Sequence, residues 1–348
     1  TTAIFTYSLH FAEALTRQPT SSYRPIMVRI SLVQVGLIVL LLDTTTGTWS
    51  MLSDIGATLV TIVVGWHLWV IFRMLRTSLS TNFAATVPFY LAALAFFITA
   101  VVVAVVASHG VGDYTRMIAI HSRLTIWGFA WLTVLGTIMT LLPTLTSTKI
   151  PPQVMKRCTF ALALHSGGLI AACGFYAASW NTWAGISQLF MVVAAVLIMQ
   201  PLLAGIFAKN QRLRAAAISV MAGVIWLVAL CAADAVCVGL GQETREITRT
   251  LAPAFLGAGL LQLVTGVLLH LLPTLRGGGN HVVTAARQYA DLGGWARLGL
   301  INFGAVLTLI SPSQVPASTA VQAGLILIAL GIAGHIGVLL SALSRAHH

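Results

Sequence analysis

His10 and His67 lie inside apolar stretches, at similar distances from the basic residue that ends each stretch, which suggests a shared chemical role. An imidazole within a bilayer is costly unless it pairs, forms hydrogen bonds or binds a ligand. His10 precedes Arg17 by seven positions and His67 precedes Arg73 by six, so at about 1.5 Å per residue both lie at nearly one depth. Two neutral imidazoles from different helices could then ligate a haem iron axially. The alternative, that each ring bonds a backbone carbonyl or a neighbouring Ser or Thr, stays open.

His121 lies near the opposite end of its apolar stretch, five residues after Arg116, and Arg123 follows two residues deeper. We predict that His121 is a metal ligand of a second site. Guanidinium forks suit carboxylates, so Arg123 and Arg116 are predicted to hold haem propionates. The alternative is a helix start at the membrane interface whose basic groups reach lipid headgroups.

Three other histidines lie in apolar segments, namely His165, His270 and His335. They are weaker candidates for metal ligands. For His165 and His270 we expect hydrogen bonds at helix interfaces, because a polar side chain within a bilayer commonly bonds to a neighbouring helix.

The composition is that of an integral membrane protein. Of the 348 residues, 58% are hydrophobic and only 8% are charged, and the mean hydropathy is +0.92, far from the roughly quarter-charged composition of a soluble domain. The formal charge of +11 comes from short loops and reports topology, not a nucleic-acid partner. The four cysteines form no CxxC or CxxCH sequence, which argues against disulfides and c-type haem.

Apolar runs of about 20 residues, the length needed to cross a bilayer, predict an all-α polytopic helical bundle. The eleven predicted spans lie near 1–16, 25–43, 50–73, 84–108, 116–145, 157–179, 184–208, 215–240, 250–275, 295–311 and 318–344. We treat residues 1–348 as a single membrane domain. Because the first run must begin outside, a preceding helix is expected, which gives twelve spans with both ends in the cytoplasm.

The Lys and Arg residues divide unequally between the two sides of this layout. Only four of the 19 fall on one side: Arg116, Arg123, Arg245 and Arg249. The other fifteen fall on or near the opposite side, which the positive-inside rule identifies as cytoplasmic. The end of the chain at residue 348 is therefore predicted to be cytoplasmic.

Two segments of the sequence indicate an internal repeat. Residues 131–145, "WLTVLGTIMTLLPTL", and 261–275, "LQLVTGVLLHLLPTL", are identical at seven of fifteen positions, including LLPTL and an aligned glycine. The offset of 130 residues corresponds to four helices. Apolar helices use few residue types, so chance similarity is the alternative; the shared Pro and Gly favour a duplication of four-helix units.

Four segments carry a resemblance to a known family: "SLHFAEALTR", "GWHLWVIFRM", "HSRLTIWGFAWLTVLGTIMTLLPTL" and "AFLGAGLLQLVTGVLLHLLPTLRGGG". They resemble the membrane domain that is fused to cupredoxin domains in actinobacterial multicopper oxidases and copper nitrite reductases. That domain is similar to NnrS-type haem-copper membrane proteins and, distantly, to subunit I of haem-copper oxidases.

The resemblance implies metal-binding roles for three histidines. Counting the expected preceding helix, His10 falls on helix two and His121 on helix six, which carry metal ligands in haem-copper oxidases, and His67 falls on helix four. Helix ten offers only His270, where the fusion domains have Tyr, and helix seven lacks an adjacent His pair. Thr125 stands where those domains have Asn. A complete oxygen-reducing centre is therefore not expected. The resemblance implies haem b as the cofactor, with copper as an additional candidate.

The function implied is that of a haem-binding electron-transfer module in the cytoplasmic membrane of a bacterium. It would take electrons from a quinol or a respiratory partner and pass them to a cupredoxin-type copper domain on the outer face, of the nitrite reductase or multicopper oxidase type. One alternative is an NnrS-like haem or copper protein for nitric oxide tolerance. Another is a secondary transporter, for which the expected Gly or Pro breaks in mid-helix are scarce here.

Overall fold

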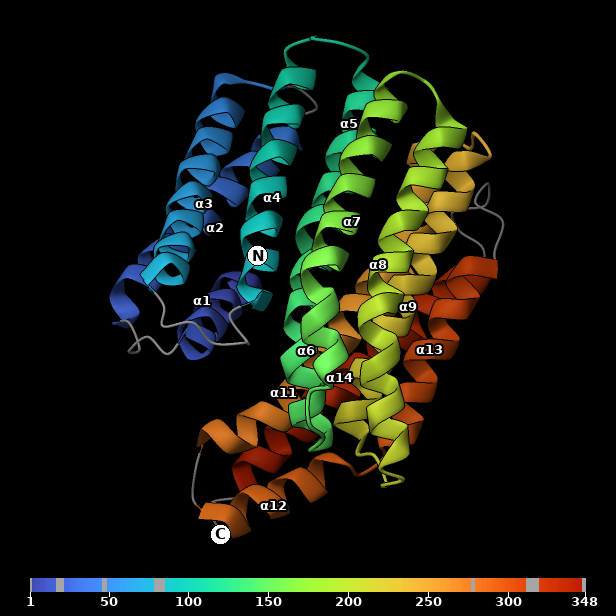
Figure 1. The fold of residues 1–348 in the computed structure, drawn as a ribbon. Helices are drawn as coiled ribbons and strands as arrows, with labels where there is room; N and C mark the ends of the chain where they lie inside the picture. Colours follow the sequence, from blue (N-terminus) through green and yellow to red (C-terminus); the bar gives the residue numbers. More distant parts are fainter. Residues whose placement is uncertain are drawn as a thin grey trace. The chain divides into compact units, whose positions relative to one another are not determined.

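The computed structural model describes residues 2–16, 22–45, 49–77, 85–276, 279–310 and 319–345. Within these ranges the chain is helical and forms no β-strand (Figure 1). The helices are α1 (Thr2–Thr16), α2 (Tyr23–Thr44), α3 (Met51–Thr77), α4 (Val87–Ser108), α5 (Tyr114–Arg123), η2 (Leu124–Trp131), α6 (Leu132–Thr146), α7 (Pro152–Ala177), α8 (Asn181–Ala208), α9 (Ala215–Gly239), α10 (Thr244–Ala254), η3 (Phe255–Leu261), α11 (Gln262–Arg276), α12 (Gly279–Ala290), α13 (Gly294–Ile310) and α14 (Thr319–Arg345).

Nine helices in the described part of the chain are long and apolar enough to cross a membrane. They are α2, α3, α4, the continuous α5–η2–α6, α7, α8, α9, the continuous α10–η3–α11, and α14. Counting the bent pair α12 and α13 as one span would make ten. The chain is thus a multi-pass membrane protein with an all-helical fold.

The predicted count of eleven spans is not confirmed. The runs at 1–16 and 295–311 do form helices, but α1 has 15 residues and α13 has 17. At 1.5 Å per residue these are about 22 Å and about 26 Å long, shorter than a hydrocarbon core of about 30 Å. The helix α13 instead follows α12 across a bend of 47°.

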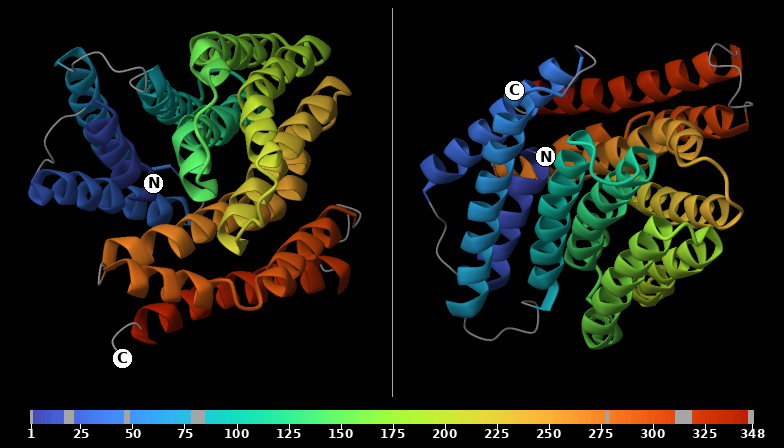
Figure 2. Two further views of the ribbon diagram at one scale, coloured as in Figure 1. Left: turned by 60° about the horizontal axis from the view of Figure 1, so that its bottom comes forward. Right: turned by 90° about the horizontal axis from the view of Figure 1, so that it is seen from above.

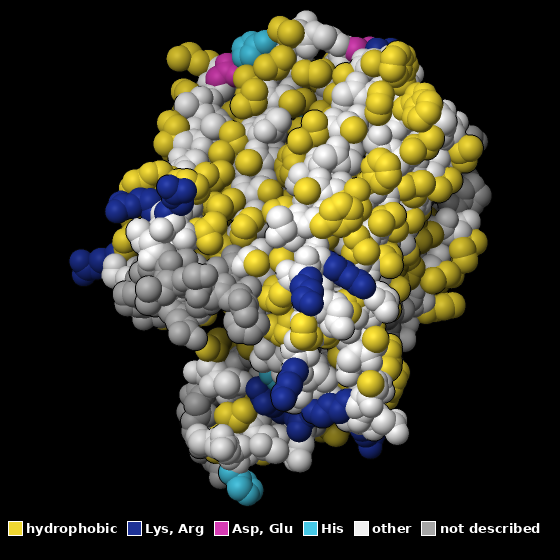
Figure 3. Space-filling view, in the orientation of Figure 1, with side chains coloured by type: hydrophobic (Ala, Val, Ile, Leu, Met, Phe, Trp, Pro, Cys, Tyr) yellow, Lys and Arg dark blue, Asp and Glu magenta, His cyan; other side chains and the backbone are white. Residues whose placement is uncertain are grey.

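Large apolar side chains on the outward faces of the helices are exposed, as expected of surfaces that contact lipid. Phe160 on α7 is 62% exposed and Phe190 on α8 is 45% exposed. Figure 3 shows hydrophobic side chains covering much of the visible faces of α7 and α8. Burying such side chains in hydrocarbon removes them from water, so a bilayer stabilises this arrangement.

The chain forms two compact units, unit 1 (Thr1–Met139 and Pro151–Pro201) and unit 2 (Thr140–Ile150 and Leu202–His348). In unit 1, α3 packs between α2 and α4, and α4 also packs against α5 and η2. In unit 2, α9 packs against α11, and α13 and α14 run side by side (Figure 2). Unit 1 contains His10, His67, His121 and His165, whereas unit 2 contains His270 and His335.

Two long helices are interrupted by π-helical segments at corresponding places. The first helix changes from α to π over Leu124–Trp131, and the second over Phe255–Leu261. Shifting the first segment by the repeat offset of 130 gives 254–261, which agrees with the second to within one residue. Pro253, just before η3, has no N–H to donate to the α-helical ladder and so favours a break there.

Candidate functional site

The helix α1 presents His10 and a buried stripe on different faces. Phe5, Ser8 and Glu13 are buried, whereas the His10 side chain is 40% exposed. His10 lies two positions after Ser8, about 200° around an α-helix. Its Nδ1–H donates to Glu13 Oε2 at 3.2 Å, because a carboxylate accepts. This bond orients the ring, and Nε2 makes no hydrogen bond to the described residues.

His67 is completely buried, and both of its ring nitrogens are engaged by unit 1. The guanidinium of Arg29 donates through Nη1 to Nδ1 at 3.0 Å, so Nε2 carries the proton and donates to Ser8 Oγ at 3.0 Å. The ring also stacks on Phe5 with a centroid distance of 4.2 Å. His67 therefore ties α3 to α1 and α2, as the hydrogen-bonding alternative predicts.

The structure does not bring His10 and His67 together as an opposed pair. The His67 ring meets the stripe that carries Phe5 and Ser8, and His10 lies on another face of α1. In this arrangement His67 has no nitrogen left for iron, since one accepts from a cation and the other is protonated. Axial ligation by this pair stays a prediction that requires His67 to release Ser8.

Arg29 is a site residue that was not predicted from the sequence. It lies on α2 with 2% exposure, donates through Nε to Pro25 O at 3.2 Å and stands over the Trp66 ring at 5.5 Å. Its charge and that of buried Glu13 interact electrostatically. The sequence feature that points to such a role is its position inside an apolar span, because a charge there needs a partner.

His121 is held by a backbone carbonyl of a neighbouring helix. Its Nδ1–H donates to Ala100 O on α4 at 2.8 Å, and Thr125 Oγ1 donates to the carbonyl of His121 at 2.9 Å. The ring is half-buried, and its Nε2 makes no hydrogen bond to the described residues. Metal-binding histidines commonly donate their other N–H to a carbonyl or carboxylate, and His121 has this arrangement.

The two arginines near His121 have different surroundings. Arg123 is 3% exposed, donates through Nη1 to Ala119 O at 3.4 Å and lies over the Tyr176 ring of α7 at 5.5 Å. Arg116 is exposed, and its backbone N–H bonds to Asp113 at the start of α5. Of the two predicted anchors, Arg123 alone extends into the helix packing.

His165 on α7 is fully buried beside the first π-helical segment. Its Nε2–H donates to Trp127 O at 3.0 Å, and its Nδ1 has no partner among the described residues. A side chain that bonds a helix carbonyl commonly accompanies a break in the ladder. The expected interface hydrogen bond is thus present, and one lone pair stays available.

The histidines of unit 2 bond to neighbours. His335 donates through Nδ1 to Gly331 O at 3.0 Å and lies 3.5 Å from Ser219 Oγ. His270 accepts at Nε2 from Arg287 at 3.1 Å. Among the described residues, no three His, Cys, Asp or Glu side chains are grouped so that they could hold a metal ion.

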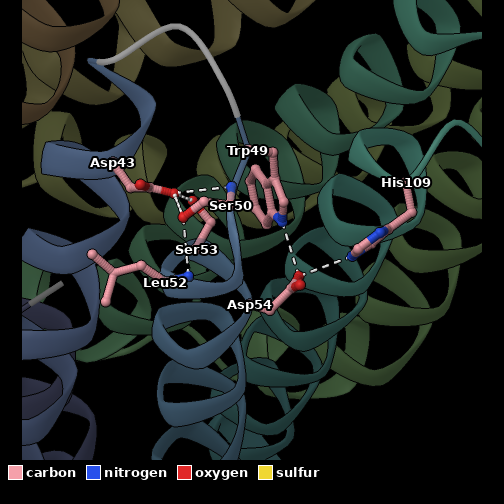
Figure 4. A network of polar contacts seen from close by, with 7 residues as sticks. All are labelled: Asp43, Trp49, Ser50, Leu52, Ser53, Asp54 and His109. Atoms are coloured by element: carbon pink, nitrogen blue, oxygen red, sulfur yellow. Dashed lines mark hydrogen bonds and ion pairs between the residues drawn. The ribbon is translucent and has the colours of Figure 1, made fainter.

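A polar network at one end of unit 1 was not predicted from the sequence (Figure 4). Asp43, at the end of α2, accepts from the hydroxyls of Ser50 and Ser53 at 2.8 and 2.5 Å. Asp54 accepts from Trp49 Nε1 at 2.8 Å and from His109 at 3.0 Å. The network joins the ends of α2, α3 and α4, and its satisfied carboxylates indicate a structural role.

Compared with protein-family models and with curated protein sequences, the chain matches none.

Proposed function

We propose that the chain is a haem-binding electron-transfer protein of a bacterial cytoplasmic membrane, with His10 and His121 as ligands at two separate sites. The observation that carries the proposal is the state of their rings. Each donates Nδ1–H to a fixed acceptor, Glu13 Oε2 or Ala100 O, and its Nε2 makes no hydrogen bond to the described residues. A neutral imidazole with one anchored N–H is the form that ligates iron.

Haem b, when bound, supplies one-electron transfer. The chain's own groups orient the ligands and place positive charge. Arg123 is buried two residues after His121 and suits an anionic group such as a propionate better than exposed Arg116 does. His165 is a further candidate ligand in unit 1, because its buried Nδ1 has no partner among the described residues.

His67 is proposed as a positioning residue. Its bond to Ser8 fixes the face of α1 that lies away from His10, and its bond to Arg29 holds a cation inside the unit. Through α1 it sets the orientation of His10. Arg29 balances the buried Glu13 carboxylate that orients His10.

The finer architecture is part of the same proposal. The two π-helical segments are separated, to within one residue, by the same 130 residues as the repeated sequences, which supports a duplication within the chain. A twelve-span layout related to haem-copper oxidase subunit I would follow from the sequence resemblance. A quinol or a respiratory partner is proposed as electron donor, and a cupredoxin-type copper domain, on the same or a partner chain, as acceptor.

Optical spectra and metal analysis test the proposal directly. The purified chain, oxidised and then reduced with dithionite, is expected to show a Soret band and stoichiometric iron. His10→Ala and His121→Ala should each remove one haem or lower the haem content by about half. The matched control is His281→Ala, since His281 is exposed on α12 of unit 2.

A chain without a Soret band or bound iron would overturn the proposal, as would full haem content in both variants. If haem is bound but is not reduced rapidly by a quinol, a nitric oxide tolerance protein replaces the electron-transfer assignment. Copper is measured in the same samples and in a further variant, His165→Ala, which tests whether His165 binds a second metal.

A further inference from the structure

Unit 2 contains a group of basic and polar side chains that the proposed haem sites do not use. We call it the arginine cluster, and it consists of Arg214, Arg287, His270 and Thr274. Arg287, on α12, donates through Nη2 to His270 Nε2 at 3.1 Å and to Thr274 Oγ1 at 2.6 Å. Both partners are neutral acceptors on α11, so these bonds leave the charge of Arg287 uncompensated.

A second guanidinium, that of Arg214, interacts electrostatically with the same side chains. Arg214, just before α9, exerts an electrostatic effect on Arg287, and both arginines act on His270. Arginine stays protonated in proteins, so neither group can relieve the repulsion by losing its proton. The cluster therefore holds two positive charges close together.

The acidic group beside Arg214 compensates little of this charge. Asp291 Oδ2 lies 4.0 Å from Arg214 Nε, and Oδ1 accepts the backbone N–H of Ala215 at 3.0 Å. This carboxylate is thus used in part to cap the start of α9. Asp291 also interacts electrostatically with Arg297, so its charge is shared with a guanidinium outside the cluster.

Each arginine also has a buried hydrogen-bond donor that the described residues do not use. Arg287 Nε and Arg214 Nη1 are buried and have no hydrogen-bond partner among the described residues. A buried donor without an acceptor is unfavourable. An anion with several oxygen atoms would satisfy these donors and neutralise the charge together.

The surroundings distinguish a lipid from a free anion. The helix α12 has 12 residues, about 18 Å, too short to cross a membrane, and it buries only one face through Ala286 and Ala290. Large apolar side chains of the same part of the chain are exposed: Leu275, next to Thr274, at 78%, and Leu292 and Trp295, in the turn after α12 and at the start of α13, at 58% and 73%. Trp is enriched at the level of lipid headgroups, which favours a ligand with both a phosphate and acyl chains.

We propose that the arginine cluster binds the phosphate of an anionic phospholipid headgroup, with the acyl chains beside Leu275 and Leu292. Guanidinium forks bind phosphate oxygens in pairs, and basic pockets between membrane helices bind anionic headgroups. The occupied site would fasten α12 to the ends of α9 and α11. This proposal is independent of haem binding.

Native mass spectrometry and thermal unfolding of the detergent-purified chain test the site, with phosphatidylglycerol and phosphatidylcholine added separately. Phosphatidylglycerol should bind and raise the Tm, and phosphatidylcholine should not. Arg214→Gln or Arg287→Gln should weaken binding by about fivefold, and the double variant by about thirtyfold. Arg157→Gln is the matched control, since Arg157 lies in unit 1, outside the arginine cluster, and donates to Gln200 Oε1 at 3.3 Å.

Equal binding of both lipids, or equal binding by the double variant, would overturn the proposal. Inorganic phosphate is a third addition; if it reproduces the full rise in Tm, the ligand is a free phosphate and the lipid assignment is wrong. Should Arg287→Gln fail to fold, Arg214→Gln and Arg287→Lys still decide the matter. The lysine keeps the charge but loses the paired donors, so intermediate affinity is expected.

Discussion

At the scale of single residues, the histidines differ in which ring nitrogen the protein leaves available. Depth along a helix predicts that His10 and His67 are equivalent, but hydrogen bonding separates them. His10 donates to Glu13 and keeps Nε2, whereas His67 accepts from Arg29 and donates to Ser8. The same rule, one N–H anchored and one nitrogen available, groups His10 with His121 and His165. A histidine is therefore a candidate metal ligand only where its second ring nitrogen has no hydrogen-bond partner.

The bond between His67 and Arg29 is predicted to stabilise unit 1 whether or not a cofactor is present. A double-mutant cycle of His67→Ala and Arg29→Met should give a coupling free energy of about 1.5 to 3 kcal/mol, the range for a hydrogen bond to a charged group. Ser8→Ala should cost only about 1 kcal/mol, since it removes a neutral partner. Unfolding in mixed micelles measures the free energy of the parent chain, the two single variants and the double variant, with Ser8→Ala beside them.

The cycle is performed on chain purified without haem, so that lost ligation cannot contribute to the free energy. Trp66→Phe serves as a control, because it alters the ring under Arg29 and leaves the hydrogen bond in place. A coupling near zero would show that the two side chains do not meet.

At the scale of helices, the apolar pattern predicts where the helices lie but not where they are interrupted. Runs such as 184–208 predict α8 well, because apolar length decides whether a segment can cross a membrane. The π-helical segments could not be predicted in this way. The contact of His165 with Trp127 joins residues 38 positions apart, and the Ser8–His67 contact joins residues 59 apart, so neither has a local sequence signal.

The contact between α13 and α14 is predicted to depend on two glycines. A Cβ at Gly304 would lie 2.6 Å from Gly324 O, and a Cβ at Gly324 would lie 2.6 Å from Gly304 O. Because the obstacle is backbone, the helices must separate. Gly304→Ala or Gly324→Ala should therefore lower the free energy of unfolding by about 1 to 3 kcal/mol, the usual cost of overpacking.

Each of these variants has a matched control in the same helix. A Cβ at Gly299 of α13 or at Gly337 of α14 meets nothing within 4 Å. Alanine there should be neutral or stabilise by up to about 1 kcal/mol, because alanine favours the helix over glycine. Equal losses at all four positions would argue against close packing at Gly304 and Gly324.

At the scale of the whole molecule, the sequence predicts the class of protein but not the number of spans. The hydropathy and the low charge content correctly indicate a multi-pass helical membrane protein. The short helices α1 and α13 differ from the prediction because an apolar run of fewer than 18 residues can form a helix without crossing the membrane alone. Charge distribution supplies orientation, which hydropathy does not.

Orientation gives the last prediction, made for the two ends of α9. Arg212 and Gln242 are exposed on either side of this span, and its basic end carries Lys209, Arg212 and Arg214. The positive-inside rule predicts that this end is cytoplasmic. In a variant with Ala at Cys158, Cys173, Cys231 and Cys237, a membrane-impermeant maleimide should label Gln242→Cys in intact cells. Arg212→Cys should react only after the cells are permeabilised, and the parent without cysteine should not react. Labelling of Arg212→Cys alone in intact cells would reverse the predicted topology.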